Sequence, residues 1–237
     1  MHQPITHQPY LQSLEYLKKK QRVLFLTTSN RWSGEEGGQM PKSTQLAYQL
    51  SHQLEGKAQV IEVPTMNIFS CEGNVSTERG NTCGEQKASL KDDQKNPTGH
   101  HRCWASINHP DDELWKISKE LLQSDCVVFF SSVRWGQTNA IYQKLIERLT
   151  WLENRHSTLG ENNILEGIDA GLILIGQNWH GKEVLETQKK VLEFFGFHIV
   201  DDLFWNWQFL ENAEEEDQES YRKAPKAFKE TFLRVLE

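Results

Sequence analysis

The chain has 237 residues, of which 37% are hydrophobic and 25% are charged, and its formal net charge is −7. This length favours one large domain or two small ones with a substantial buried core, and no apolar stretch approaches the roughly 20 residues of a membrane span. Because an acidic surface repels phosphate backbones, nucleic-acid binding is disfavoured as the main activity.

The N-terminal segment, residues 1–21, is predicted to be an extension that carries no chemistry. Residues 1–20 contain no run of about seven apolar residues, so we expect neither a secretory signal nor a transit peptide. A short helix over residues 10–19 is expected to pack outside the main sheet. The cysteines lie at positions 71, 83, 103 and 126 and do not form a disulfide framework, which favours the cytoplasm.

The remaining chain, residues 22–237, alternates between apolar segments and segments of helical periodicity. The strongest apolar segments are hydrophobic nearly throughout, which indicates strands buried on both faces, as in a parallel sheet covered by helices. Strands are predicted over residues 22–28, 59–63, 125–131, 170–176 and 197–200, and helices over residues 43–54, 111–122, 139–152, 182–195 and 220–236. This order predicts a doubly wound α/β fold, which binds ligands beyond the carboxyl ends of its strands.

The loop after the first strand is rich in hydroxyl groups. Ser29 follows the strand, and Ser43 and Thr44 begin the next helix. Hydroxyls and backbone N–H groups at a helix N-terminus form a phosphate-binding site, to which Arg31 or Lys42 can add charge-assisted contacts. The alternative is that Ser43 simply caps the helix.

Residues 37–44 also approach the P-loop pattern GxxxxGK[ST]. Pro41 stands before Lys42, however, where the pattern requires a glycine, and proline has no N–H to donate to a phosphate. A nucleoside triphosphatase is therefore disfavoured.

A second motif follows the third strand, where residues 131–140 read Ser-Ser-Val-Arg-Trp-Gly-Gln-Thr-Asn-Ala. With Lys144 and Arg148 on the next helix, this segment resembles the flavin-contacting loop of the NADPH-dependent FMN reductase family. That family includes the iron–sulfur flavoproteins, belongs to the flavodoxin-like superfamily and characteristically reads Ser-Pro-Val-Tyr-Trp-Gly here. The resemblance implies a three-layer α/β/α sandwich with a five-stranded parallel sheet in the order 2-1-3-4-5 and a long insertion, residues 64–110, after the second strand.

The resemblance also implies a function. An FMN-dependent enzyme would use NAD(P)H to reduce a quinone, flavin or nitroaromatic acceptor through flavin N5, without a catalytic side chain, in a homodimer. The phosphate would be held by Ser29, Arg31, Ser43 and Thr44, and the ring lined by Ser132, Val133, Arg134, Trp135, Gly136 and Gln137. A non-enzymatic electron carrier and a flavin-free regulatory protein on the same fold are the alternatives.

Three positions depart from the family pattern: Ser132 replaces proline, Arg134 replaces tyrosine and Glu147 replaces aspartate. Arg134 could place a cation near the flavin ring or near an incoming anionic nicotinamide cofactor, so the departure bears on the choice of substrate. Lys144 and Arg148 are interpreted as structural or interface residues rather than flavin ligands.

The insertion carries three of the four cysteines. Iron–sulfur members of the family have a compact cysteine cluster here, but Asn74 replaces its second cysteine, so a [4Fe–4S] centre and any other metal are not expected. The favoured interpretation is an ordered cap over the flavin or a dimer arm. The alternative is a tetrahedral zinc site formed by Cys71, Cys83, Cys103 and either His100 or His101.

Aromatic residues follow the last two predicted strands. Trp179 and His180 lie on the expected site rim, where Trp179 could flank the ligand and His180 is interpreted as a solvent-facing or capping residue. Trp205 and Trp207 are expected to be exposed, either as a wall of the site or as a subunit contact.

Overall fold

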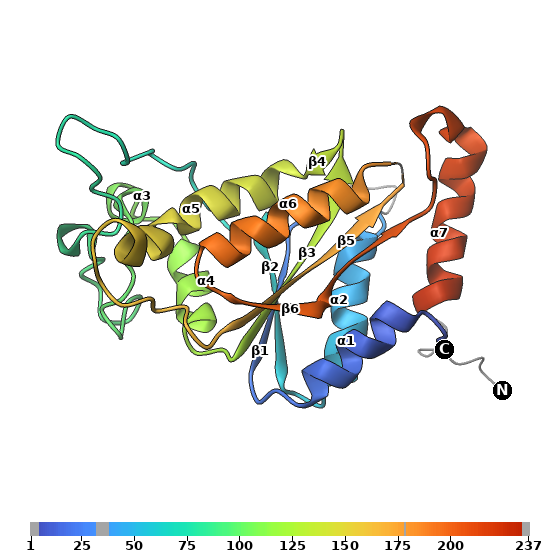
Figure 1. The fold of residues 1–237 in the computed structure, drawn as a ribbon, viewed down its shortest axis with the longest axis horizontal. Helices are drawn as coiled ribbons and strands as arrows, with labels where there is room; N and C mark the ends of the chain where they lie inside the picture. Colours follow the sequence, from blue (N-terminus) through green and yellow to red (C-terminus); the bar gives the residue numbers. More distant parts are fainter. Residues whose placement is uncertain (1–4, 32–37, 178, 234–237) are drawn as a thin grey trace.

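The computed structural model describes residues 5–31, 38–177 and 179–233. A parallel sheet lies between two layers of helices (Figure 1). Its main strands run in the order β2-β1-β3-β5-β6, and the short β4 pairs with β3 in the antiparallel direction. The strands are β1 (Val23–Thr27), β2 (Ala58–Glu62), β3 (Cys126–Arg134), β4 (Gln137–Thr138), β5 (Asp169–Gly176) and β6 (His198–Gln208). The five-stranded doubly wound order is thus confirmed, with β4 as an addition.

The helices form two layers because the central strands are buried on both faces. Leu24 and Leu26 of β1 join the cluster under α4, α5 and α6, whereas Val23 and Phe25 join the cluster under α1, α2 and α7. This alternation follows from the two-residue period of a strand. The α-helices are α1 (Gln8–Lys18), α2 (Lys42–His52), α3 (Trp104–Asn108), α4 (Leu114–Leu121), α5 (Ala140–Ser157), α6 (Gly181–Phe194) and α7 (Gln218–Phe232), with 3₁₀ turns η1 (Val63–Thr65), η2 (Gln86–Ala88) and η3 (Ala213–Glu215).

The N-terminal helix is part of the core rather than an outlying extension. Its residues Tyr10, Leu14 and Leu17 are buried in the cluster that also contains β6 and α7. The buried hydroxyl of Ser13 donates to the Asp202 carbonyl at 2.6 Å. The prediction of a helix near residues 10–19 is therefore correct, and α1 covers the last strand of the sheet.

The predicted exposure of two tryptophans is wrong, because β6 is much longer than the sequence pattern indicated. Trp205 and Trp207 lie within this strand, and Trp205 is buried with its Nε1 donating to Ser13 Oγ at 2.8 Å. Trp207 stacks edge-to-face on Phe228 of α7. These rings hold α7 against the sheet and do not form an exposed patch.

The start of α4 also differs from the prediction, which began this helix at residue 111. The helix begins at Leu114, and Asp112 lies before it with a fully buried side chain. One Asp112 oxygen accepts from the Leu114 N–H at 3.2 Å, but its main partner is Arg148 on α5. Across the described ranges, no helix is both long and apolar enough to cross a membrane.

Candidate anion-binding site

A cavity of about 360 Å³ opens at the carboxyl ends of β1, β3 and β5. Doubly wound folds bind their ligands at this edge. Four segments line it: the β1–α2 connection, the end of β3, the end of β5 and the start of α7. The lining residues are Ser29, Asn30, Arg31, Pro41, Lys42, Ser43, Ser132, Val133, Arg134, Trp135, Ile175, Gly176, Gln177, Glu216, Tyr221 and Pro225.

The N-terminus of α2 forms one wall of the cavity. Its N-cap is Pro41, whose side chain cannot accept a hydrogen bond from the first turn. Among the described residues, the N–H groups of Lys42, Ser43 and Thr44 therefore have neither an intrahelical partner nor a side-chain cap. Ser43 lies inside the first turn and donates its hydroxyl to Ser29 Oγ at 2.7 Å, so the alternative of a simple Ser43 cap is wrong.

Two cations lie at this helix terminus and a third faces it. Arg31 and Lys42 belong to the β1–α2 wall and Arg134 to the end of β3, and burial together with the charges of Arg31 and Arg134 lowers the pKa of Lys42. Among the described lining residues, Glu216 is the one carboxylate. Cations gathered at an uncapped helix N-terminus repel one another until an anion binds between them. The residues present therefore fit a phosphate group, and the phosphate-binding role of Ser29, Arg31 and Ser43 stays a prediction.

A tight hairpin forms the opposite wall. Val133 and Arg134 of β3 pair with Thr138 and Gln137 of β4, and the two residues between them, Trp135 and Gly136, have φ of 51° and 69°. Positive φ at both positions is what a type I′ turn requires, and a bulky residue rarely adopts it. Trp135 is nevertheless 94% exposed. The hairpin therefore holds an indole in solvent at the mouth of the cavity.

Asn139 connects the end of β3, beside the cavity, to the start of α5. Its Oδ1 accepts from the Tyr142 N–H at 3.0 Å as the N-cap of α5, and its Nδ2 donates to Ser131 Oγ at 2.9 Å and to Ser132 Oγ at 3.2 Å. One amide thus fixes the end of β3 and the start of the next helix. Sequence reasoning did not assign it a role, although asparagine before a helix is a recognisable cap.

The start of α7 forms a wall that the sequence did not predict. Glu216, Tyr221 and Pro225 line the cavity, and a hydrogen bond to Glu216 raises the pKa of Tyr221. The α7 segment is joined to β5 because Gln177 Nε2 donates to Ser220 Oγ at 3.1 Å. The acidic run before α7 gave no signal of this role, since such runs are usually solvated.

The ten predicted cofactor-binding residues divide into two groups. Seven of them line the cavity, whereas Thr44, Gly136 and Gln137 do not. Thr44 is buried, and its hydroxyl has no hydrogen-bond partner among the described residues. Gly136 lies in the hairpin turn, and Gln137 is exposed on β4. The seven that line the cavity are Ser29, Arg31, Ser43, Ser132, Val133, Arg134 and Trp135.

The rim residues near β5 take structural positions. His180 is the N-cap residue of α6, with φ of 67°, and a Cβ placed on Gly136 would lie 3.7 Å from its side chain. The hairpin thus rests against His180, whose side chain forms no cap hydrogen bond to α6 among the described residues, so the interpretation of this histidine as a capping residue gains no support. Trp179 is partly exposed beside it. Neither residue lines the cavity.

The insertion lies away from the cavity. Figure 1 shows it, in teal and green, at the end of α5 remote from β4, and no residue of the range 64–110 lines the cavity. A cap over the site is therefore not what the described residues form. The alternative of a dimer arm stays a prediction.

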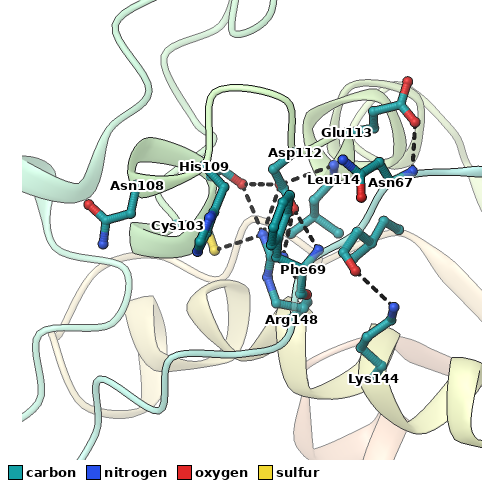
Figure 2. A network of polar contacts seen from close by, with 12 residues as sticks. Asn67, Phe69, Cys103, Asn108, His109, Asp112, Glu113, Leu114, Lys144 and Arg148 are labelled. Atoms are coloured by element: carbon teal, nitrogen blue, oxygen red, sulfur yellow. Dashed lines mark hydrogen bonds and ion pairs between the residues drawn. The ribbon is translucent and has the colours of Figure 1, made fainter.

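A buried arginine fastens the insertion to the sheet (Figure 2). Arg148 of α5 donates to Asp112 at 2.7 and 2.9 Å, and both side chains are fully buried. It also donates to the Phe69 carbonyl at 2.7 Å and to Ser106 Oγ at 3.0 Å. One turn earlier, Lys144 Nζ donates to the Ile68 carbonyl at 2.8 Å. Both cations are therefore structural residues, as the sequence indicated.

The cysteines and histidines of the insertion pack in the same region. Cys83 and Cys103 are buried, and burial raises the pKa of Cys83 to about 12. His101 is buried with Nδ1 2.8 Å from Ser118 Oγ, and burial lowers its pKa to about 4. In the part of the chain that the structure describes, no three His, Cys, Asp or Glu side chains are arranged to hold a metal ion. The zinc alternative gains no support.

Solved structures are similar to this chain in fold, although its sequence matches no family model and no curated protein. Among solved structures, RosB with a bound 8-demethyl-8-formylriboflavin-5′-phosphate intermediate matches with a TM-score of 0.55 at 15% identity, covering 91% of this chain and 75% of RosB. The azoreductase AzrA matches with a TM-score of 0.49 at 11% identity, covering 90% and 96%. An NAD(P)H:quinone oxidoreductase from Methanothermobacter marburgensis matches with a TM-score of 0.47 at 11% identity, covering 90% and 95%.

The strand order and the RosB match both bear on the architecture. The parallel sheet has the order 2-1-3-4-5, counted without the short β4, with helices on both faces, and RosB shares this fold at a TM-score of 0.55. The chain therefore has the flavodoxin-like fold that its sequence resemblance implied.

Proposed function

We propose that this protein is a flavin-dependent oxidoreductase that binds FMN in the cavity and uses NAD(P)H to reduce a small acceptor. The observation that carries the proposal is the cationic N-terminus of α2, where Arg31, Lys42 and Ser43 line the cavity and Pro41 supplies no side-chain cap. A phosphate dianion is the ligand that such a terminus stabilises. On the same fold, RosB holds a riboflavin 5′-phosphate derivative.

Each wall has a separate task in this proposal. Ser29, Ser43 and the first N–H groups of α2 bind the phosphate, and Lys42 and Arg31 neutralise its charge. The end of β3 lines the flavin ring with Val133 and backbone groups, and Trp135 shields it from water. When bound, the flavin supplies hydride transfer through its N5 atom to an acceptor of the quinone, flavin or nitroaromatic class.

No described residue is required as a catalytic acid or base for that chemistry. The protein holds the ring, excludes water from one side and stabilises negative charge on the pyrimidine end through backbone N–H groups. We further propose that the protein acts in the cytoplasm, which its cysteine pattern favours, and as a homodimer, which the family resemblance implies.

FMN titration of the purified protein, followed by its visible absorption and by calorimetry, tests the proposal. Saturable binding of one FMN per chain is expected, and Ser43→Ala should weaken it several-fold by removing one phosphate hydrogen bond. Steady-state NAD(P)H oxidation with quinone, flavin and nitroaromatic acceptors then separates an enzyme from an electron carrier. A colourless protein that binds no added FMN would sink the proposal.

A further inference from the structure

The mouth of the cavity holds a cation that the phosphate site does not require. The phosphate-binding wall already contains the α2 N-terminus, two hydroxyls and the charges of Arg31 and Lys42. Arg134 comes from the opposite wall, at the end of β3. None of the ion pairs formed within the described ranges includes it.

The position of Arg134 is fixed by its backbone. It pairs with Gln137 of β4, so it is the last residue before the Trp135–Gly136 turn. Its charge acts both on Lys42 across the cavity and on Tyr221 of α7. Arg134 is exposed and lines the same cavity as Lys42 and Tyr221, so its charge lies at the rim of the opening.

The neighbouring residue gives this cation a planar partner. Trp135 is 94% exposed although its backbone has the left-handed conformation that bulky residues avoid. Strain and exposed apolar area at one residue are typical of a binding position, because folding alone favours neither. An indole provides a face for stacking on an aromatic ring, and a guanidinium provides donors for an acid group.

The one carboxylate in the described lining does not cancel this charge. Glu216 lies on the α7 side of the cavity and forms no ion pair with Arg134 among the described residues. Arg134 thus faces an opening where an incoming molecule meets an exposed cation and an exposed indole.

We propose that Arg134 and Trp135 form a second binding site at the cavity mouth, which takes an aromatic anion, a planar ring carrying a negatively charged group, as the second substrate of the proposed reductase. The inference rests on the proposed function and names the substrate class of the same site. Two sources supply this chemistry: the phosphate groups of a nicotinamide dinucleotide, or an acid group on the electron acceptor itself.

The variant Arg134→Gln tests the assignment, with Arg222→Gln as the matched control. Arg222 is exposed on α7 and does not line the cavity, so this control removes the same charge from the protein without changing the site. FMN affinity is measured first for all three proteins by calorimetry. The oxidised, FMN-loaded proteins are then titrated with NADP⁺, with anthraquinone-2-sulfonate and with its neutral analogue 2-(hydroxymethyl)anthraquinone.

We expect Arg134→Gln to weaken binding of an anionic probe about tenfold, the effect of losing one charge-assisted hydrogen bond. Binding of the neutral anthraquinone and of FMN should change less than twofold, and Arg222→Gln should match the wild type. Loss confined to NADP⁺ identifies the dinucleotide as the source of the anion, and loss confined to the sulfonate identifies the acceptor. Loss of both supports one site shared by the two.

Two results would overturn the inference. If Arg134→Gln weakens FMN itself tenfold, Arg134 belongs to the phosphate site, and if both anionic probes bind unchanged, no second anion site exists there. Failure of the proposed function is distinguishable, because the wild-type protein would then bind no FMN. In that case the same probes, titrated into the FMN-free protein, decide separately whether Arg134 binds an aromatic anion.

Discussion

The cavity and the insertion are both rich in polar and charged residues, but they use them in opposite ways. Where the insertion meets α5, the Arg148 guanidinium donates to acceptors from three segments and the Asp112 carboxylate is completely enclosed. In the cavity, Lys42 shares the lining with Arg31 and Arg134, and an indole is held in solvent on a strained turn. The first region satisfies most of its polar groups internally, although Arg148 Nε has no hydrogen-bond partner among the described residues, and the second leaves its cations for a ligand.

This difference is informative because burying a charge, or placing like charges close together, raises the free energy of the folded protein. A buried ion pair with additional hydrogen bonds is a structural element, whose partners are all present. Crowded cations at an uncapped helix terminus lower the stability of the ligand-free protein and are explained by what they bind. The two regions therefore respond differently to mutation: the insertion through folding and the cavity through affinity.

The largest effect is expected from Arg148→Met. It leaves Asp112 buried without a partner, and we expect the free energy of unfolding to fall by about 3–5 kcal/mol in urea titrations. Arg22→Met, which removes an exposed pair with Glu120, should change it far less. FMN affinity of the folded fraction should be unchanged.

The double variant Arg148→Met/Asp112→Leu tests the same prediction, even if the single variant fails to fold. Removing both charges should recover part of the lost stability, because no isolated charge is left in the core. An unchanged urea midpoint in Arg148→Met would show that the network does not fasten the insertion.

Acid should weaken the same network. Burial alone would raise the pKa of Asp112, but hydrogen bonds from Arg148 and Ser106 dominate and hold it below the ordinary value of 3.8. A lowered carboxyl pKa contributes stability that is fully present above the unfolded value and is lost as the pH falls through the folded one. Between pH 7 and pH 3, the unfolding free energy of the wild type should therefore fall more than that of Asp112→Asn. Equal losses in the two proteins would contradict this assignment.

The cavity should show the opposite pattern in Lys42→Met. Affinity for FMN should fall tenfold or more, because a charge-assisted contact to the phosphate is lost. The free energy of unfolding without FMN should not fall and should rise slightly, because Arg31 and Arg134 no longer repel a third cation. Lys190→Met, on the exposed side of α6, serves as the control and should change neither quantity. A parallel loss of stability and affinity would make Lys42 a structural residue.

Much of the fold could be predicted from the sequence, because its central strands are apolar on both faces. The near-continuous hydrophobicity of residues 22–28 and 170–176 is a direct consequence of burial between two helical layers. The last strand was predicted too short because its residues are only partly buried and include Asp201 and Asp202, which strands usually exclude.

The site was predictable where its signal is local in sequence. Ser29 and Ser43 flank one loop, and Arg134 and Trp135 belong to one turn, so position after a strand was enough to suggest them. Glu216 and Tyr221 come from the end of the chain and reach the cavity only through tertiary packing of α7 on β6. Asp112 was placed inside the predicted helix over residues 111–122 and was given no partner, since Arg148 is distant in sequence.

The smallest effect, and the one that separates folding from binding most directly, is expected from Trp135→Asn. Asparagine before glycine suits a type I′ turn, so the change should raise the free energy of unfolding by about 1 kcal/mol through relief of backbone strain. Phe194→Asn, at an exposed aromatic within α6, removes a comparable ring without such relief and should give no gain. FMN affinity should change less than threefold, because the phosphate is held on the opposite wall, whereas the aromatic anion should bind several-fold more weakly. A residue that lowers the stability of the protein but strengthens binding of the aromatic anion serves the ligand rather than the fold. If Trp135→Asn instead lowers the free energy of unfolding, the indole is part of the fold. The contrast between the two regions would then not hold at this position.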